Sequence, residues 1–316
     1  MTSLPSRALA PAKINLGLFV GPVREGDSRH ELASVMQSIS LADELTLESA
    51  SVAPSASGED QIVCPGVPAS AGENLAGVAL RLFRETTGWE VGPLRLSVDK
   101  RIPVAAGLGG GSADAAAALR LARHVSGLGS DELLLELGAR LGADVPAQIA
   151  PGRWLATGAG ERLRELPPPS HPFGVLVLPI AAELSTAEVY ARADELGIQR
   201  TSEALREIAT DLGVAFELGA AAPAAHELLR NDLQPAAIVL CPELVRALEE
   251  ALEAGADAAF VSGSGPTVVG LFLRANGPGR AERAAAGLAG RDPAPVCAVP
   301  VDTDYARAVG PAIRNN

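Results

Sequence analysis

The 316-residue chain is 47% hydrophobic and 20% charged, which is normal for a folded globular protein and excludes an intrinsically disordered one. Its 38 acidic residues outnumber its 26 basic residues, and the formal charge of −12 argues against nucleic-acid and membrane partners. We therefore expect a soluble protein of two domains, for which a single nucleotide remains an acceptable ligand because it needs only a local positive field.

Cysteines, histidines and the N-terminus favour a cytoplasmic protein. The three cysteines and four histidines are scattered, without a Cys-x-x-Cys pair, which predicts reduced thiols and neither a disulfide framework nor a zinc site. Arg7 and Lys13 interrupt the apolar N-terminal segment, so we expect no signal peptide. The longest apolar run, over residues 173–182, is too short to cross a bilayer.

The first half of the chain alternates strand and helix patterns. Residues 7–20 and 35–50 are extended and half-buried, and apolar residues alternate with polar ones over 94–99, which predicts a strand with one wet face. Apolar residues at helical spacing predict a helix over 74–88 that ends at its glycine. Two further predicted helices cover 112–123 and 131–141, and Ser130 is the expected N-cap of the second.

A proline run at 167–169 marks the predicted boundary between a domain over 1–166 and a domain over 167–316. Beyond it the predicted order is strand, helices, strand, strand, helix, strand, which favours a ferredoxin-like α+β sandwich with extra helices. The strands are expected at 174–178, 258–261, 267–273 and 296–301, and the first set of helices includes 201–212 and 242–254.

The segment from Pro103 to Asp114 carries the strongest chemical signal. Four glycines between Gly107 and Gly111 let the backbone approach a bulky ligand and point successive N–H groups into one concavity. Ser112 then opens a helix whose free N–H groups and dipole favour an anion. We interpret the segment as a phosphate cradle, different from the Gly-x-x-x-x-Gly-Lys-Ser/Thr loop because no Lys follows. The simpler alternative is a flexible turn before a helix.

Three other segments carry candidate polar groups. Lys13 and Asn15 fall on the same side of a predicted strand, although Lys13 could be an edge residue that reaches solvent. Asp144 follows a helix and precedes Pro146, where a turn-forming Asp is the commoner use. A second glycine turn over 261–267 joins two strands and could serve as a hairpin loop alone.

Together these segments resemble the GHMP small-molecule kinases. They occur in the same order as in that family and extend from residue 11 to residue 267. Four stretches, over 10–16, 98–103, 106–116 and 141–146, are most similar to the branch of that family whose substrate is 4-diphosphocytidyl-2-C-methyl-D-erythritol. The resemblance implies a two-domain α+β fold with an N-terminal ATP-binding α/β domain and a C-terminal ferredoxin-like domain. It also implies ATP-dependent phosphorylation of the 2-hydroxyl of that cytidine diphosphate substrate in non-mevalonate isoprenoid biosynthesis.

The same resemblance assigns roles to residues. Asp144 would accept the proton of the substrate hydroxyl, and Lys13 would hold the reacting groups and stabilise the developing negative charge. Mg²⁺ would bridge the ATP phosphates, with Ser112 as one candidate contact and the other ligands unidentified. Lys100 belongs to the implied adenine pocket but could equally be a solvated strand end. The implied ATP contacts are Asn74, Lys100, Pro103, Ala106, Gly107, Leu108, Gly109, Gly110, Gly111, Ser112 and Ala113.

The cytidine end departs from the family. The family's Asp-Gly-Tyr-His-Glu-Leu reads Asp-Ser-Arg-His-Glu-Leu at 27–32, so Arg29 replaces the Tyr that stacks on cytosine. A planar guanidinium can stack on a base, so we expect Arg29 and Tyr190 to sandwich the cytosine while His30 reads its edge. The alternative is that Arg29 is a solvated loop residue. The implied substrate contacts are Asn15, Arg29, His30, Thr186, Tyr190, Gly263 and Ser264.

Two other functions remain open from the sequence. One is a GHMP kinase for another alcohol, of the homoserine or mevalonate type. The other is a non-catalytic GHMP-fold protein that binds a nucleotide or sugar, although a binder has no use for the pair Lys13 and Asp144. The sequence also leaves the oligomeric state open, a weak homodimer included.

Overall fold

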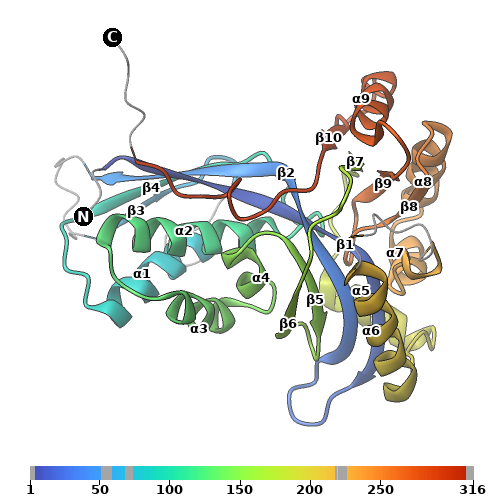
Figure 1. The fold of residues 1–316 in the computed structure, drawn as a ribbon, viewed down its shortest axis with the longest axis horizontal. Coiled ribbons are helices and arrows are strands. Elements are labelled where there is room, and N and C mark those ends of the chain that lie inside the picture. The colour runs from blue at the N-terminus through green and yellow to red at the C-terminus, as the bar shows by residue number, and fades with distance from the viewer. Residues whose placement is uncertain (1–3, 51–58, 68–73, 218, 220–225, 311–316) are drawn as a thin grey trace.

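The computed structural model describes residues 4–50, 59–67, 74–217, 219 and 226–310, which form two β-sheets with helices packed against them (Figure 1). The larger sheet has the order β3-β4-β2-β5-β6. Strands β4 and β5 pair with different parts of one edge of the long strand β2, and β1 pairs along its opposite edge. Its pairings are antiparallel except that of β3 with β4. The strands are β1 (Ser6–Val23), β2 (His30–Ser49), β3 (Gln61–Val63), β4 (Leu94–Asp99), β5 (Arg153–Thr157) and β6 (Arg162–Leu166).

Strands β1 and β2 are long, and Figure 1 shows them running from the side of the N-terminal helices to the side of α5 and α6. The register between them shifts between Pro11 and Lys13 and again between Asn15 and Gly17. Such bulges re-aim the side chains of a strand and are common next to active sites. The two irregularities therefore bracket the segment that carries Lys13 and Asn15.

Helix α2 (Gly110–Ser126) packs on β1 and β2 of the larger sheet, and α1 (Leu75–Thr87), α3 (Asp131–Leu141) and α4 (Val145–Ile149) pack against α2. The predicted helices over 74–88 and 131–141 are confirmed as α1 and α3, the first with Gly88 at its end and the second with Ser130 as its N-cap. Asn74 accepts from the N–H groups of Ala76 and Gly77, and Ser130 accepts from that of Leu133. Helix α2 begins at Gly110, two residues before the predicted Ser112, because Gly109 occupies the N-cap position with a φ of +70°.

The smaller sheet has the order β10-β7-β9-β8 and is antiparallel throughout, which is the strand order of a ferredoxin-like fold. The predicted strands are confirmed, although the last ends three residues early, at Ala298. The strands are β7 (Gly174–Leu178), β8 (Ala258–Val261), β9 (Val268–Phe272) and β10 (Val296–Ala298). The helices are α5 (Thr186–Glu195), α6 (Ser202–Glu217), the 3₁₀ helix η1 (His226–Leu228), α7 (Gln234–Leu240), α8 (Glu243–Glu253) and α9 (Gly277–Gly287).

One hydrophobic core joins the two halves. Ile14 and Leu16 of β1 are buried in the same cluster as Phe173, Val175 and Val269 of the smaller sheet and its approach. The boundary after residue 166 therefore stays a prediction, since packing continues across it.

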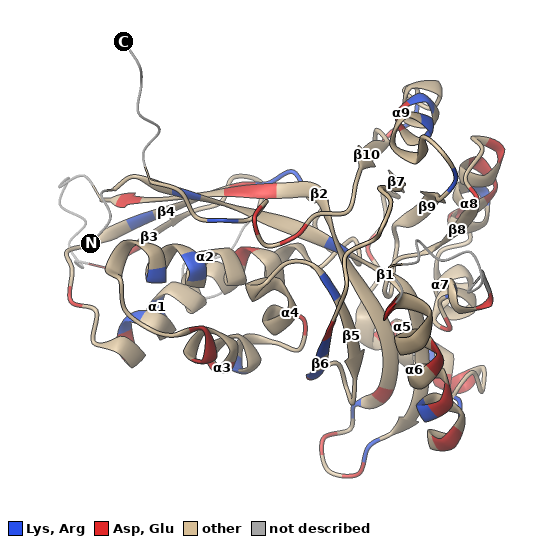
Figure 2. Cartoon of the chain, viewed as in Figure 1, with Lys and Arg blue, Asp and Glu red and all other residues tan. Residues whose placement is uncertain are grey.

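Charged residues of both signs follow one another along α6 and α8 (Figure 2). Among the described helices, none has the length and hydropathy needed to cross a membrane.

Candidate active site

A cavity of about 1020 Å³ opens where the glycine turn, β1 and α5 meet. Its volume is at the upper end of the range for small-molecule sites. Every predicted site residue except Leu108 and Ala113 lines it; those two side chains are buried in the hydrophobic cores instead. The lining predicted residues are Lys13, Asn15, Arg29, His30, Asn74, Lys100, Pro103, Ala106, Gly107, Gly109, Gly110, Gly111, Ser112, Asp144, Thr186, Tyr190, Gly263 and Ser264.

Lys13 lines the cavity, and its side chain is largely buried. Its Nζ donates to Asn15 Oδ1 at 2.8 Å and lies 3.6 Å from Asp144 Oδ2. The Lys13 side chain is 10% exposed and that of Asp144 is 40% exposed. The alternative in which Lys13 reaches solvent from a sheet edge is therefore wrong. A buried cation beside an open carboxylate can orient a hydroxyl and stabilise negative charge on its oxygen.

A chain of hydrogen bonds fixes Asn15. Its Nδ2 donates to Ser34 Oγ at 2.7 Å, and Ser34 Oγ donates to the Gly17 carbonyl, also at 2.7 Å. Because the amide nitrogen is occupied by Ser34, the amide oxygen of Asn15 faces the Lys13 ammonium. The sequence did not point to Ser34, which pairs with Leu18 in the register of the two strands, whereas Asn15 pairs with Met36.

Asp144 occupies the N-cap position of α4, but its side chain makes no capping hydrogen bond. The preceding helix α3 ends at Leu141, and Pro146 opens the short helix α4. Pro146 lies in the first turn of α4, where proline is common because its missing N–H is not needed there. The carboxylate of Asp144 is left free to bind a ligand in the cavity.

The glycine turn is clamped between β1 and the loop from β8 to β9. The Lys13 N–H donates to the Leu108 carbonyl at 2.9 Å, and Ser262 Oγ donates to the Gly107 carbonyl at 3.2 Å. A Cβ at Gly107 would lie 2.3 Å from the Ser262 carbonyl oxygen, so no other residue fits there. The loop after Val261 joins a hairpin, as its simpler interpretation required, but it also holds the turn in place. Asn231 supports it by donating to the Gly263 carbonyl.

Lys100 lies between two buried carboxylates. Its Nζ donates to Asp43 and, at 2.7 Å, to Asp114 Oδ2, and its side chain is only 13% exposed. The alternative of a solvated strand end is wrong. Asp43 also accepts from the N–H groups of Arg101 and Ile102, whereas Asp114 Oδ1 is buried without a partner among the described residues. One cation thus faces two carboxylates, and Asp43 is the better satisfied of them.

Asp114 gives a pH dependence of stability. Burial, together with the negative charge of Asp43, raises its pKa to about 7 against the attraction of Lys100. Because the pKa of Asp114 is higher in the folded than in the unfolded state, the protonated carboxyl stabilises the fold. This stabilisation is complete below about pH 4 and is lost as the pH rises through about 7.

We expect Asp114→Asn to remove that loss. Between pH 4.5 and 8 the free energy of unfolding of the wild type should fall relative to the variant by a few kcal/mol, since one pKa unit corresponds to about 1.4 kcal/mol. Urea unfolding at several pH values measures the difference. Parallel pH profiles for the two proteins would show that Asp114 carries no such proton.

The far end of the cavity contains two stacked rings. Tyr190 of α5 and His30 lie 5.1 Å apart between centroids with an interplanar angle of 29°. His30 Nδ1 lies 3.1 Å from the Gly21 carbonyl, and its Nε2 lies 3.3 Å from Asp194 Oδ1. Burial raises the pKa of the Tyr190 phenol to about 12, and the charge of Asp144 adds to the effect. The Tyr190 ring therefore lies close enough to Asp144 to feel the charge of its carboxylate.

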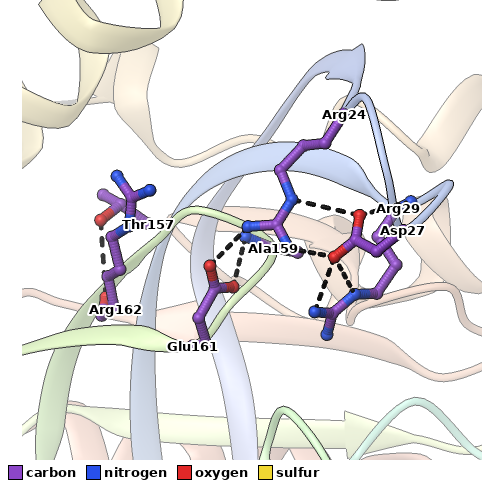
Figure 3. Close-up of polar contacts among 7 residues, drawn as sticks. All are labelled: Arg24, Asp27, Arg29, Thr157, Ala159, Glu161 and Arg162. Atoms are coloured by element: carbon purple, nitrogen blue, oxygen red, sulfur yellow. Dashed lines mark hydrogen bonds and ion pairs between the residues drawn. The ribbon is translucent and has the colours of Figure 1, made fainter.

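Arg29 lies at the mouth of this end but is bound to Asp27 rather than to a ring (Figure 3). Asp27 also binds Arg24, which holds the pKa of that carboxyl well below its usual range, and Arg24 in turn pairs with Glu161. The loop between β1 and β2 is thus tied to the turn between β5 and β6. The ring in contact with Tyr190 is His30, so the sandwich of cytosine between Arg29 and Tyr190 stays a prediction.

The site suits a magnesium ion that arrives with a nucleotide. The described residues contain no group of three or more His, Cys, Asp and Glu side chains that could hold a metal ion alone. Mg²⁺ is usually bound through one or two carboxylates together with substrate phosphates. Asp144, which lines the cavity, has a carboxylate, and Ser112 at the glycine turn offers a hydroxyl oxygen.

Comparisons with known proteins agree with this site. Residues 74–152 match the GHMP kinase N-terminal domain, and residues 203–292 match the GHMP kinase C-terminal domain. The 4-diphosphocytidyl-2-C-methyl-D-erythritol kinase of Corynebacterium efficiens is 41% identical over 279 residues, which are 83% of each chain. That of Streptomyces coelicolor is 40% identical over 297 residues, or 88% of this chain and 95% of the relative.

Solved structures agree as well. A crystal structure of 4-(cytidine 5'-diphospho)-2C-methyl-D-erythritol kinase superposes with a TM-score of 0.73 at 32% identity, covering 93% of this chain and 98% of the other. A homoserine kinase from Cytophaga hutchinsonii superposes with a TM-score of 0.72 but at 18% identity, which supports the fold alone. The chain belongs to the GHMP kinase family, and within it to the 4-diphosphocytidyl-2-C-methyl-D-erythritol kinases.

Proposed function

We propose that this chain transfers the γ-phosphoryl group of ATP to the 2-hydroxyl of 4-diphosphocytidyl-2-C-methyl-D-erythritol. The observation that carries the proposal is the Lys13–Asp144 pair, 3.6 Å apart in a cavity that has a glycine turn beside it and stacked rings beyond it. The cavity can therefore hold the phosphates of ATP at the glycine turn, the reacting hydroxyl at Lys13 and Asp144, and the nucleobase of the substrate at the stacked rings.

The mechanism assigns one task to each group. Asp144 takes the proton of the substrate hydroxyl, and the Lys13 ammonium stabilises the negative charge that develops on that oxygen. The oxygen bonds to the γ-phosphorus while the bond from that phosphorus to the bridging oxygen breaks and ADP leaves. Backbone N–H groups of the turn around Gly109 and of the first turn of α2 hold the phosphates. Bound Mg²⁺ supplies further neutralisation of the phosphate charge.

Positioning and charge stabilisation suffice for this chemistry, since phosphoryl transfer needs little covalent help from protein. The direct test is incubation of the purified chain with ATP, Mg²⁺ and the cytidine substrate. We expect stoichiometric ADP and a product that carries a new phosphate monoester on the 2-oxygen, identified by ³¹P NMR. Hydrolysis of ATP that is independent of the alcohol, with no new monoester, would contradict the proposal.

The cytidine contacts give a further expectation. Tyr190→Ala should raise the KM of the cytidine substrate by about one to two decades, because base stacking contributes roughly 1–3 kcal/mol. Arg29→Ala should raise it equally or less, since a half-exposed guanidinium is partly screened. Release of Arg29 from Asp27 costs little, because exposed ion pairs are weak and Asp27 keeps Arg24 as its partner.

Arg29→Tyr separates stacking from a bystander role. If Arg29 stands in for the family's ring, this variant should match or exceed the wild type in affinity for the cytidine substrate. Methylerythritol without the CMP group should respond to none of the three changes. If the KM is the same in Arg29→Ala, Arg29→Tyr and wild type, then Arg29 is a solvated loop residue and the base is held from the Tyr190 side.

A further inference from the structure

The cytidine end contains an acidic side chain that the proposed chemistry does not use. Asp194 lines the cavity from α5, and its side chain is 39% exposed. It lies four residues after Tyr190 and eight after Thr186, so the three side chains follow one face of the helix. At 1.5 Å per residue the stripe rises about 12 Å from Thr186 to Asp194.

The two ends of this stripe differ in chemistry. At its start, Thr186 Oγ1 lies 2.9 Å from Ser264 Oγ, in the loop that clamps the glycine turn. At its far end, Asp194 contacts His30, which stacks on Tyr190. A ligand with a reacting hydroxyl at Lys13 and Asp144 would therefore place its remote group at Asp194.

His30 is committed as a donor in this arrangement. A carbonyl oxygen can only accept, so the contact of His30 Nδ1 with the Gly21 carbonyl requires a proton on Nδ1. The other ring nitrogen, Nε2, faces Asp194 Oδ1 at 3.3 Å. Both ring nitrogens of His30 are thus directed at oxygen atoms of the protein.

Asp194 has an acceptor to spare. Its Oδ1 is shared by His30 and by Gln199 Nε2, which donates at 2.6 Å. In the part of the chain that the structure describes, no residue donates to Oδ2. Arg29, the other charged side chain at this end, carries donors alone and is bound to Asp27.

We propose that Asp194 determines base specificity by accepting a hydrogen bond from the exocyclic amine of a 4-aminopyrimidine. A uracil presents a carbonyl oxygen at the same position, and two acceptors facing each other leave both without a proton. The proposal rests on the proposed function, because it assumes that the remote group of the substrate is a pyrimidine base. It adds a reason why that base is cytosine.

The test compares the cytidine substrate with its uridine analogue in wild type and Asp194→Asn. Asn is isosteric and can donate to a carbonyl, so the ratio of kcat/KM for cytidine over uridine should fall by at least tenfold. The change should arise in KM, because Asp194 lies far from the catalytic pair. Glu188→Gln is the control: it removes one negative charge from an exposed position of the same helix and should keep the wild-type ratio.

Calorimetric binding of CDP and UDP gives a second measurement without turnover. The wild type should bind CDP more tightly, and Asp194→Asn and Asp194→Ala should lose at least tenfold of that preference. An unchanged preference in both variants, in kinetics and in binding, overturns the role of Asp194 while leaving the kinase function intact. A wild type that phosphorylates neither substrate instead overturns the proposed function and this inference with it.

Discussion

Asp144→Asn should lower kcat by a factor on the order of 10² or more while leaving ATP binding nearly unchanged. The Asp144 side chain makes no capping bond and faces Lys13 across 3.6 Å, so its carboxylate is available to the substrate hydroxyl. An amide of the same shape cannot take the proton. Steady-state kinetics with saturating ATP measure the change, and nucleotide titration measures the binding.

The control is Asp211→Asn, which makes the same chemical change at an exposed position of α6. It should keep wild-type turnover. Turnover of Asp144→Asn within a few-fold of the wild type would remove Asp144 from proton transfer, and phosphoryl transfer would then depend on Lys13 and on the glycine turn.

Gly109→Val should be the most damaging change in the glycine turn. Gly109 has a φ of +70°, which a branched residue adopts only with strain, and its Cβ would lie 3.0 Å from Lys13 Cγ and 3.2 Å from Lys13 Cε. The sequence alone predicts weaker ATP binding, because a side chain blocks the approach of the backbone to phosphate. The structure adds displacement of Lys13. The KM for ATP should therefore rise and kcat should fall, each by about tenfold or more.

Gly127→Val is the matched control. Gly127 is the C-cap of the same helix, has the same φ of +70°, and has no atom within 4 Å of its Cβ position. It therefore carries the backbone strain without the contact with Lys13. Similar melting temperatures for the two variants, with ATP affinity lost only in Gly109→Val, support the phosphate cradle. Equal losses of affinity for ATP and alcohol, accompanied by a lower melting temperature, would favour a simple structural turn.

The sequence predicted most of the fold because local signals were strong. Helix α1 has both its caps in the sequence, Asn74 and Gly88, and the strand order of the smaller sheet follows from the alternation of strands and helices. Strands β5 and β6 were missed because each is only five residues long and β6 has only two apolar residues, Leu163 and Leu166. Helix α5 was missed as a helix because Val189 and Tyr190 are its only large apolar residues.

The site was predicted by residue type and by resemblance, and its partners were not. Lys13 and Asp144 are far apart in the chain, and no spacing rule brings Asp43 or Asp114 to Lys100. Asp194 was not found, because its place one helical turn after Tyr190 follows only once residues 186–195 are known to form a helix. Arg29 was predicted to contact the base because it precedes His30 in the sequence. Its contact with Asp27 depends on the conformation of the loop, which the sequence does not reveal.

The most direct test of the central claim is the dependence of kcat/KM on the CMP group of the alcohol. With ATP and Mg²⁺ saturating, the purified chain should phosphorylate 4-diphosphocytidyl-2-C-methyl-D-erythritol at least about a hundredfold more efficiently than methylerythritol, homoserine or mevalonate. Stacking on Tyr190 and the polar contacts at His30 and Asp194 each contribute to that preference. Equal or greater efficiency with homoserine or mevalonate would contradict the account.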